Sequence, residues 1–166
     1  VIRRHDCADL APSHTPEGLN GMVYNRCVGT RYCGNNCSYK VRRFNYFDYS
    51  RHNWPGNLNL MQNPDVTTRQ QGVMEKCTFC VQRIESARQG AKDEKRPIAD
   101  GEVQTACQQS CPTGAITFGN SRDPKSQVIA KSKDTGRSFH ALQVLNTRPA
   151  ITYLAQVKRD DERSHG

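Results

Sequence analysis

The chain has 166 residues and a formal net charge of +8, and Val, Ile, Leu and Phe make up only about one sixth of it. This small apolar fraction excludes a large core that folds unaided, so we expect metals, disulfides or a partner to stabilise the chain. No apolar run approaches the ~18 residues of a membrane-spanning helix. Because the first residue is Val1, we expect the chain to be processed or to be part of a longer protein. The lack of a targeting segment says nothing about its compartment.

The first half of the chain is predicted to contain little regular structure. Residues 1–22 lack periodicity and are predicted to form a loop, and residues 27–37 form a dense cysteine run. Residues 38–47 are basic and aromatic, which favours an extended segment. Residues 50–71 are rich in Asn, Pro, Gly and Gln, which predicts another loop.

The second half contains the clearest helix. Apolar residues recur at helical spacing over residues 73–89, and Gly90 is expected to end that helix. A shorter helix is predicted over residues 102–110 with Asp100 as its cap, and a short strand over residues 115–118.

The C-terminal quarter is predicted to be mostly irregular. Residues 119–137 are polar and predict a loop. Residues 139–145 and 151–157 carry apolar side chains that we expect to dock on the core or on a partner.

The first cysteine run predicts a metal cluster. Cys27, Thr30, Cys33 and Cys37 follow the iron–sulfur spacing C-x2-C-x2-C-x3-C, with threonine in place of the second cysteine. A cubane cluster needs a thiolate on each of its four irons, so three thiolates and a hydroxyl favour a three-iron cluster. Such a cluster leaves no iron for a substrate, and this points to electron transfer.

A second cysteine group has the same terminal spacing. Cys77 and Cys80 are separated by two residues, Cys107 and Cys111 by three, and Pro112 follows. The cysteine before proline normally reaches the other cluster of a pair. A zinc site built from these four cysteines and a set of disulfides remain open as alternatives. Cys7 considered alone is more often an ordinary buried thiol.

The positive charge is not interpreted as a nucleic-acid signal. Eight thiolates and the charge of their clusters would offset much of the formal +8. Residues 40–49 interleave basic and aromatic side chains, which single-stranded nucleic acid can use. We favour the simpler interpretation that these aromatics shield a cluster. The histidines lack ligand spacing and no catalytic triad or phosphate loop is present, so no catalytic residue is assigned.

Six segments carry a family resemblance, namely residues 15–20, 24–33, 40–45, 72–84, 111–116 and 148–155. They closely resemble the iron–sulfur subunit of bacterial alternative complex III. That subunit falls in the broader class of four-cluster iron–sulfur subunits of molybdopterin-type membrane oxidoreductases. The resemblance covers nearly the whole chain.

The resemblance implies a ligand set. Cys7, Cys27 and Cys33 would hold a 3Fe–4S cluster, with Thr30 at the vacant corner. The remaining five cysteines would serve 4Fe–4S clusters: Cys77, Cys80 and Cys107 one, Cys37 a second and Cys111 a third, with the missing ligands upstream of this chain.

The chain departs from the family pattern around two cysteines. Arg3 stands where a further ligand is expected, and Ala8 and Ser38 stand where proline usually follows a final cysteine. These departures leave the Cys37 cluster open. A self-contained alternative places Cys37 with Cys77, Cys80 and Cys107 on one cube, and Cys111 with Cys27 and Cys33 on the other.

We therefore predict an α+β, loop-rich, ferredoxin-like cluster module that is stabilised by its clusters and by partner subunits. Residues 1–118 would form the cluster-binding domain, and residues 119–166 a C-terminal extension that docks on the core or on partners. By resemblance, the module relays electrons from membrane quinol oxidation to cytochrome c-type acceptors and has no independent catalytic site.

The resemblance also implies the surroundings of the module. Its partners would be an integral-membrane quinol-binding subunit, c-type haem subunits and the rest of the same iron–sulfur subunit, with no nucleic acid. It would sit peripherally at the periplasmic face of the bacterial inner membrane. The alternatives are an iron–sulfur subunit of another molybdopterin-type oxidoreductase and a zinc-stabilised nucleic-acid-binding module.

Overall fold

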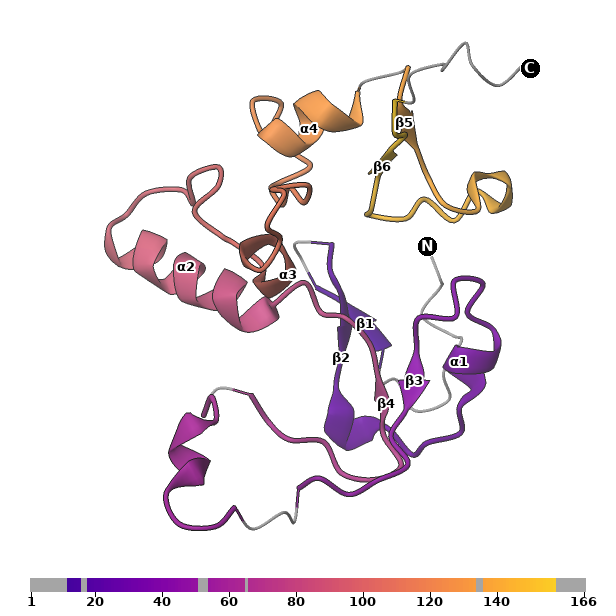
Figure 1. Cartoon of the computed structure of the whole chain (residues 1–166), viewed down its shortest axis with the longest axis vertical. Coiled ribbons are helices and arrows are strands. Elements are labelled where there is room, and N and C mark those ends of the chain that lie inside the picture. The colour runs from indigo at the N-terminus through magenta and orange to yellow at the C-terminus, as the bar shows by residue number, and fades with distance from the viewer. Residues whose placement is uncertain (1–11, 16–17, 51–53, 65, 134–135, 158–166) are drawn as a thin grey trace, which may run out of the picture.

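The fold is a chain of loops held by three small sheets and a few short helices (Figure 1). The computed structural model describes residues 12–15, 18–50, 54–64, 66–133 and 136–157. Each sheet is a two-stranded antiparallel pair: β1 (Pro12–His14) with β2 (Asn20–Met22), β3 (Arg43–Phe44) with β4 (Met74–Glu75), and β5 (Ser138–Phe139) with β6 (Tyr153–Leu154). The prediction of a loop-rich α+β module is confirmed.

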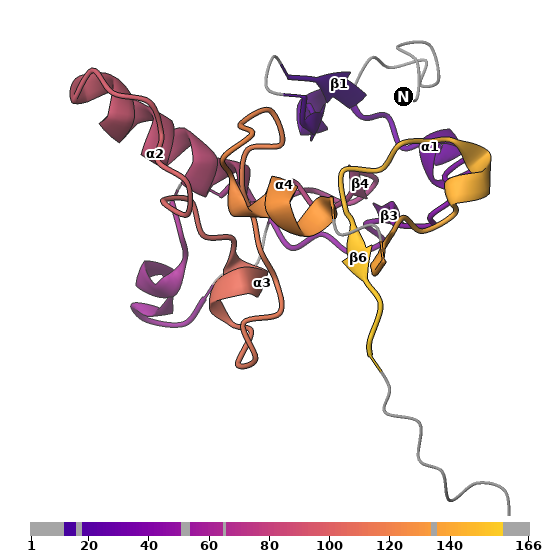
Figure 2. The same ribbon diagram turned by 90° about the horizontal axis from the view of Figure 1, so that it is seen from above.

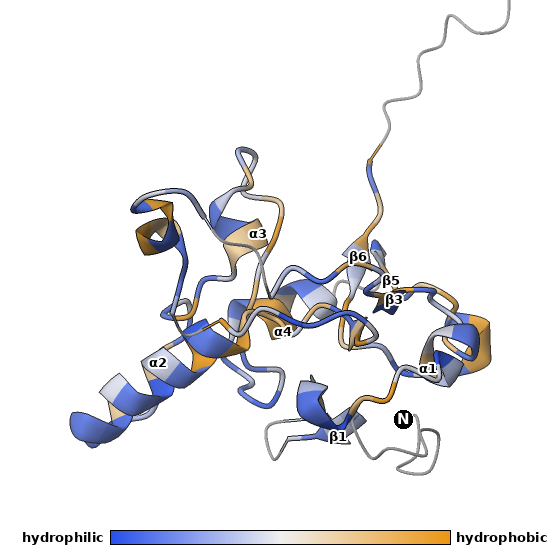
Figure 3. Cartoon of the chain, turned by 90° about the horizontal axis from the view of Figure 1, so that it is seen from below, coloured by the Kyte–Doolittle hydropathy of each residue, from blue (hydrophilic) through white to orange (hydrophobic). Residues whose placement is uncertain are grey.

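Most helices in the described ranges are a single turn. They are α1 (Tyr32–Asn35), α2 (Val81–Asp93), α3 (Ala106–Gln109) and α4 (Gln127–Ser132), with 3-10 turns η1 (Tyr24–Arg26), η2 (Leu58–Met61) and η3 (Gln143–Leu145). The longest, α2, has 13 residues and extends away from the body of the molecule (Figure 1). Its outer turns are hydrophilic (Figure 3), although Ala91 in its last turn is buried, as is Ile84 near its start.

The predicted helix over residues 73–89 is wrong at both ends. Met74 pairs with Phe44 in β4, and α2 begins only at Val81. Long-range strand pairing therefore overrides the local periodicity. Gly90 does not end the helix, which continues to Asp93, because a helix tolerates glycine at an open surface position.

The second predicted helix is shorter than expected and has a different cap. Only Ala106–Gln109 is helical, and Thr105 caps it by accepting the Gln108 amide at 3.3 Å. Asp100 instead caps α4. It accepts the Ser126 hydroxyl at 2.6 Å and the Gln127 amide at 3.1 Å.

Three further segments differ from the sequence prediction. Residues 115–118 form no strand, and residues 119–137 contain α4 rather than only loop. Within residues 12–22, the β1–β2 hairpin replaces the predicted loop, because the Thr15 hydroxyl and carbonyl bond back to the turn at 3.2 and 2.9 Å.

The β3–β4 pair is the centre on which the first cysteine run packs. The ladder continues beyond the strands. The Asn45 amide donates to the Val73 carbonyl, and the Gly72 amide donates to the Asn45 carbonyl, both at 2.9 Å. Gly29 lies against this extension at a φ of +75°, where a Cβ would collide with the Gly72 carbonyl oxygen. Only glycine fits there without strain. The buried apolar side chains of the described residues are few: Cys37, Met74, Ile84 and Ala91.

The C-terminal segment contacts the chain just after the first cysteine run. In β5–β6, the rings of Phe139 and Tyr153 stack at 5.5 Å between centroids. Seen from above, the loop between these strands, which contains η3, passes over the α1 end of the molecule (Figure 2). Tyr39 joins the two regions, because its hydroxyl contacts the Ala141 carbonyl at 3.3 Å and the Thr147 hydroxyl.

Candidate metal centre

Cys27 is held against the central strand pair. It follows η1 directly, and its Sγ accepts the backbone N–H of Met74 at 3.4 Å. Met74 is 3 % exposed, so this amide lies in a place that water reaches poorly. A buried amide aimed at a sulfur is a donor that a metal-bound sulfur can accept.

The helix α1 packs against the same strand pair and carries Cys33, with Cys37 just after it. Cys33 is the second residue of α1, and Gly34 follows it so close to β4 that a Cβ there would lie 2.8 Å from Met74 Cε. Cys37 comes just after the helix and is buried, whereas Thr30 is exposed. The structure therefore brings Cys27 and the α1 cysteines onto the β3–β4 pair.

The loop from Cys77 to Cys80 has an uncommon backbone. Phe79 and Cys80 have φ values of 56° and 54°, which side chains other than glycine rarely adopt. This turn lets the Phe79 amide donate to Cys77 Sγ at 3.4 Å. Consecutive amides in such turns form concave anion sites, which many iron–sulfur proteins use. The Phe79 ring stacks on Phe118 at 6.0 Å and so anchors the loop.

The second pair of cysteines approaches this loop through α3. The Ala106 amide, at the first position of α3, donates to Cys80 Sγ at 3.2 Å. Cys107 is the next residue, so the structure brings Cys80 and the start of the Cys107 helix together. Thr105 lies before them, with its Oγ1 3.2 Å from Cys107 Sγ.

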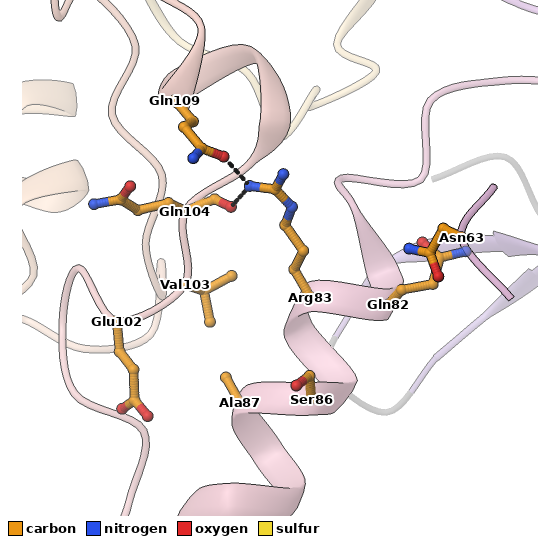
Figure 4. A pocket seen from close by; sticks show the side chains of 9 residues that line it. All are labelled: Asn63, Gln82, Arg83, Ser86, Ala87, Glu102, Val103, Gln104 and Gln109. Carbon is orange, nitrogen blue, oxygen red and sulfur yellow. Dashed lines mark hydrogen bonds between the residues drawn. The ribbon is translucent and has the colours of Figure 1, made fainter. Parts of the chain in front are cut away.

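Arg83 fixes α3 relative to α2. Its Nη1 donates to the Gln104 carbonyl at 2.8 Å and to Gln109 Oε1 at 2.9 Å (Figure 4). These two acceptors lie at opposite ends of the α3 segment. These groups line an open, polar hollow of about 580 Å³, with Glu102 and Val103 on its far side. Because the guanidinium is already bonded, we assign it the role of holding α3 in place.

The two C-x3-C segments have the same backbone form. Cys33 and Cys107 are each the second residue of a four-residue helix. The C-caps Asn36 and Ser110 both have φ −82°, with ψ −6° and −4°. Each following cysteine donates its amide to the third helix residue, at 3.3 Å for Cys37 and 3.2 Å for Cys111. The repeated spacing in the sequence is thus a repeat in structure.

Cys111 is the cysteine whose ionisation is most clearly favoured. Hydrogen bonds from the Thr113 hydroxyl and from the Ala115, Thr113 and Ile116 amides lower the pKa of the Cys111 thiol to about 7. The turn around Gly114, with a φ of +60°, brings these donors to the sulfur. A thiolate is the form that ligates a metal.

A partly buried cation lies next to Cys77. Lys76 Nζ donates to the carbonyls of Asn20 and Cys77. Burial lowers the pKa of Lys76, the neighbouring Arg42 lowers it further, and Cys77 opposes the shift. Lys76 therefore ties the β1–β2 hairpin to the start of the second cysteine loop.

The donor set fits iron–sulfur ligation. Amide N–H groups from four separate places in the chain point at four cysteine sulfurs, those of Cys27, Cys77, Cys80 and Cys111. Hydrogen bonds of this kind to ligand sulfurs are a recognised means of tuning such clusters. No disulfide joins the seven described cysteines. Cys7 lies outside the described residues.

The described cysteines do not form a ready-made site for a single metal ion. Within the described residues, no three His, Cys, Asp or Glu side chains come close enough together to hold a single metal ion. Those residues include Cys77, Cys80, Cys107 and Cys111.

The relatives of this chain agree with the donor set. No protein-family model matches the chain. The iron–sulfur cluster-binding subunit of menaquinone reductase from Nitratidesulfovibrio vulgaris is 39 % identical over 156 residues, which cover 90 % of this chain and 59 % of that protein. The chain is related to iron–sulfur subunits of oxidoreductases.

Two further relatives are similar over most of the chain. Hdr-like menaquinol oxidoreductase iron–sulfur subunit 1 of Archaeoglobus fulgidus is 38 % identical over 74 % of this chain and 41 % of its own length. The B subunit of polysulfide reductase from Wolinella succinogenes is 30 % identical over 87 % of this chain and 56 % of its own length. The chain thus spans about half the length of the curated relatives it matches. No helix in the described ranges combines the length and apolarity that a bilayer crossing requires.

Several groups around the sulfurs were not singled out from the sequence. The Met74 and Ala106 amides touch the sulfurs of Cys27 and Cys80 only because of folding. Thr113 is different, since its position two residues after Cys111 in a Pro-Thr-Gly turn is a local signal.

Proposed function

We propose that this chain is an electron-transfer module that holds iron–sulfur clusters in a quinol-oxidising complex. The observation that carries the proposal is the set of four amide-to-sulfur hydrogen bonds, together with the absence of any disulfide among the described cysteines. When bound, such clusters supply one-electron chemistry over a wide range of potentials. The residues of this chain hold the clusters and set their surroundings.

The positions of the described cysteines support the proposed ligand assignment. Cys80 contacts the first residue of α3, which supports a 4Fe–4S set of Cys77, Cys80 and Cys107. Cys27 and α1 share the β3–β4 pair, which supports grouping Cys27 with Cys33. With Cys7, these two would hold a 3Fe–4S cluster that has Thr30 at its vacant corner. Cys37 and Cys111 would each ligate another 4Fe–4S cluster.

The complex is proposed to be like alternative complex III. In that proposal an integral-membrane subunit oxidises quinol, c-type haem subunits accept the electrons, and the module sits peripherally at the periplasmic face. A second candidate is an iron–sulfur subunit of another molybdopterin-type oxidoreductase. The similarity to subunits named for menaquinone and menaquinol chemistry supports a quinone-linked complex in both cases.

An apolar projection supports the presence of a partner subunit. Leu60 and Met61, in η2, are 79 % and 81 % exposed, and Trp54 and Leu58 beside them are also exposed. This loop projects from the body (Figure 1), and its described residues 54–64 carry no charge. Exposed apolar groups of this kind mark interaction sites.

We assign the projection to a protein partner rather than to lipid. Amide side chains such as Asn59 and Gln62 alternate with its apolar residues. Mixed apolar and amide groups suit a protein interface, whereas attachment to anionic lipid needs lysine or arginine. The C-terminal extension, residues 119–166, is proposed to dock on the cluster domain, and the contacts of Tyr39 with Ala141 and Thr147 support this.

The deciding experiment uses the intact complex purified without oxygen. We expect a brown protein that contains iron and acid-labile sulfide and shows separate low-temperature EPR signals for three-iron and four-iron clusters. Cys27→Ser should remove the three-iron signal and Cys77→Ser a four-iron signal, while Ser38→Ala, next to Cys37, should keep both. A colourless, zinc-containing wild-type protein would refute the proposal and favour the nucleic-acid-binding alternative.

A further inference from the structure

Thr105 occupies a buried position between the two cysteine pairs of the second group. It is only 2 % exposed, although Ala106 and Cys107 after it are exposed. Its φ of −70° and ψ of 154° place it at the N-cap of α3. At this position a hydroxyl oxygen is expected to accept an amide from inside the helix, and Thr105 Oγ1 accepts the Gln108 N–H at 3.3 Å.

That hydrogen bond determines what the hydroxyl proton can do. A hydroxyl has one proton to donate, and the cap contact uses only its oxygen as an acceptor. Cys107 Sγ lies 3.2 Å from Thr105 Oγ1. A cysteine that ligates iron is a thiolate and has no proton, so the bond can run in one direction only, from Thr105 to Cys107. Burial leaves no water to compete for the hydroxyl proton.

A donor at this sulfur has a predictable effect on a bound cluster. Reduction adds one electron, and therefore negative charge, to a cluster that shares its charge with its ligand sulfurs. A hydrogen bond to a ligand sulfur stabilises the more negative, reduced state and so raises the reduction potential. The effect is larger at a buried donor, because the local dielectric constant is low.

The chain contains a natural comparison for Thr105. Thr113 Oγ1 lies 3.3 Å from Cys111 Sγ, at nearly the same distance, but Thr113 is exposed. Water can replace an exposed donor and cannot replace a buried one. The two threonines therefore differ in burial while sharing the same contact.

We infer that Thr105 is a positioning residue that raises the reduction potential of the one cluster ligated by Cys107. This inference rests on the proposed iron–sulfur function and deepens it, since it names a residue that sets the potential of a single cluster. Thr105 does not touch iron itself. It acts through the sulfur of Cys107, and its cap contact with Gln108 holds the hydroxyl in the required direction.

The test is a reductive titration of the intact complex, followed by EPR, with dithionite as the electron donor and one electron taken up per cluster. Thr105→Val keeps the shape of the side chain and removes the donor. We expect the equilibrium constant for reduction of one four-iron cluster to fall about tenfold, which lowers its reduction potential by about 59 mV for a one-electron couple. The other signals should keep their potentials. Thr105→Ser retains the hydroxyl and should titrate like wild type, and Thr113→Val should shift its cluster less.

Thr105→Val also removes the cap acceptor, so Thr105→Ser, which keeps both the cap acceptor and the donor, is the matched control. A wild-type potential in a Thr105→Val protein that keeps its clusters would overturn the inference and leave the proposed function intact. Absence of any iron–sulfur signal in the wild-type complex would instead refute the proposed function.

Discussion

The backbone amide of Ala106 donates to the sulfur of Cys80 across 26 residues of sequence, at 3.2 Å. This contact joins the start of α3 to the loop before α2. It therefore brings together the segments that carry Cys107 and Cys80, two proposed ligands of the same cluster. It involves no side chain of Ala106, so a substitution that removes only the N–H can test it.

Ala106→Pro removes the amide N–H at a position where the local backbone accepts proline. Proline is favoured at the first position of a helix, and Thr105 already has the extended backbone that proline requires before it. A hydrogen bond to a charged sulfur contributes about 1.5–3 kcal/mol. We therefore expect the four-iron cluster to be lost to an iron chelator at least about tenfold faster, as measured by loss of visible absorption. Ala106→Ser, which keeps the amide, should behave like wild type, and equal rates for Pro and wild type would contradict the role of this contact.

Three glycines should respond differently to alanine. Gly29→Ala should be the most harmful, because Gly29 has φ +75° and a Cβ there would meet the Gly72 carbonyl. Gly34→Ala meets only the flexible end of Met74 and should cost about 1–3 kcal/mol. Gly90→Ala lies in α2 with open space around it and should stabilise the helix by about 0.5–1 kcal/mol. Anaerobic thermal unfolding of the three variants gives the order, and a Gly29→Ala protein as stable as Gly90→Ala would show that the first run does not pack on β3–β4.

The loop before α3 should make stability depend on acid pH. Hydrogen bonds from Arg96 and from the Ala99 amide lower the pKa of Glu102 to about 2, from an ordinary value of 4.5. Because the pKa of the folded state is the lower one, this contribution is complete above pH 4.5 and is lost as the pH falls toward 2. The difference in denaturant midpoint between wild type and Glu102→Gln should be constant from pH 7 to 5.5 and shrink below pH 4.5. A difference that stays the same down to pH 4 would count against this ion pair.

Thr30 offers a direct test of the three-iron assignment. Thr30→Cys completes the four-thiolate spacing, so we expect the three-iron EPR signal of the oxidised complex to be replaced by a four-iron signal on reduction. Thr30→Ser, which keeps a hydroxyl, is the matched control and should retain the original signal. An unchanged three-iron signal in Thr30→Cys would show that Thr30 is not at the vacant corner.

The apolar projection should matter for assembly and not for the clusters. Leu60→Asp places a charge on a side chain that is 79 % exposed, so it should hardly affect folding. We expect the variant to stay brown but to be recovered with much less of the membrane subunit when the complex is purified by a tag on this chain. Gln89→Asp, on the exposed face of α2, serves as the control and should copurify normally. Normal recovery with Leu60→Asp would remove the projection from the interface.

The class of site could be predicted from the printed residues alone. Cluster ligation depends on which donor atoms lie within a few residues of each other. The cysteine spacings from Cys27 to Cys37 and from Cys77 to Cys111 can be read from the sequence. The scarcity of large apolar residues likewise predicted a loop-rich module with a small core, and the structure has both. Local chemistry of this kind does not depend on the path of the chain between the motifs.

Tertiary contacts decided the rest. Residues 73–80 have a helical pattern but form β4 and a turn, because Met74 pairs with Phe44 and the backbone of Phe79 and Cys80 takes positive φ values. The sequence predicted Asp100 as the cap of the helix before Cys111, but Thr105 caps α3, and Asp100 accepts from Ser126 and Gln127 at the start of α4. The amides of Met74 and Ala106, which reach the sulfurs of Cys27 and Cys80, come from distant segments. A pattern within one segment carries no information about which backbone amide another segment will bring to it.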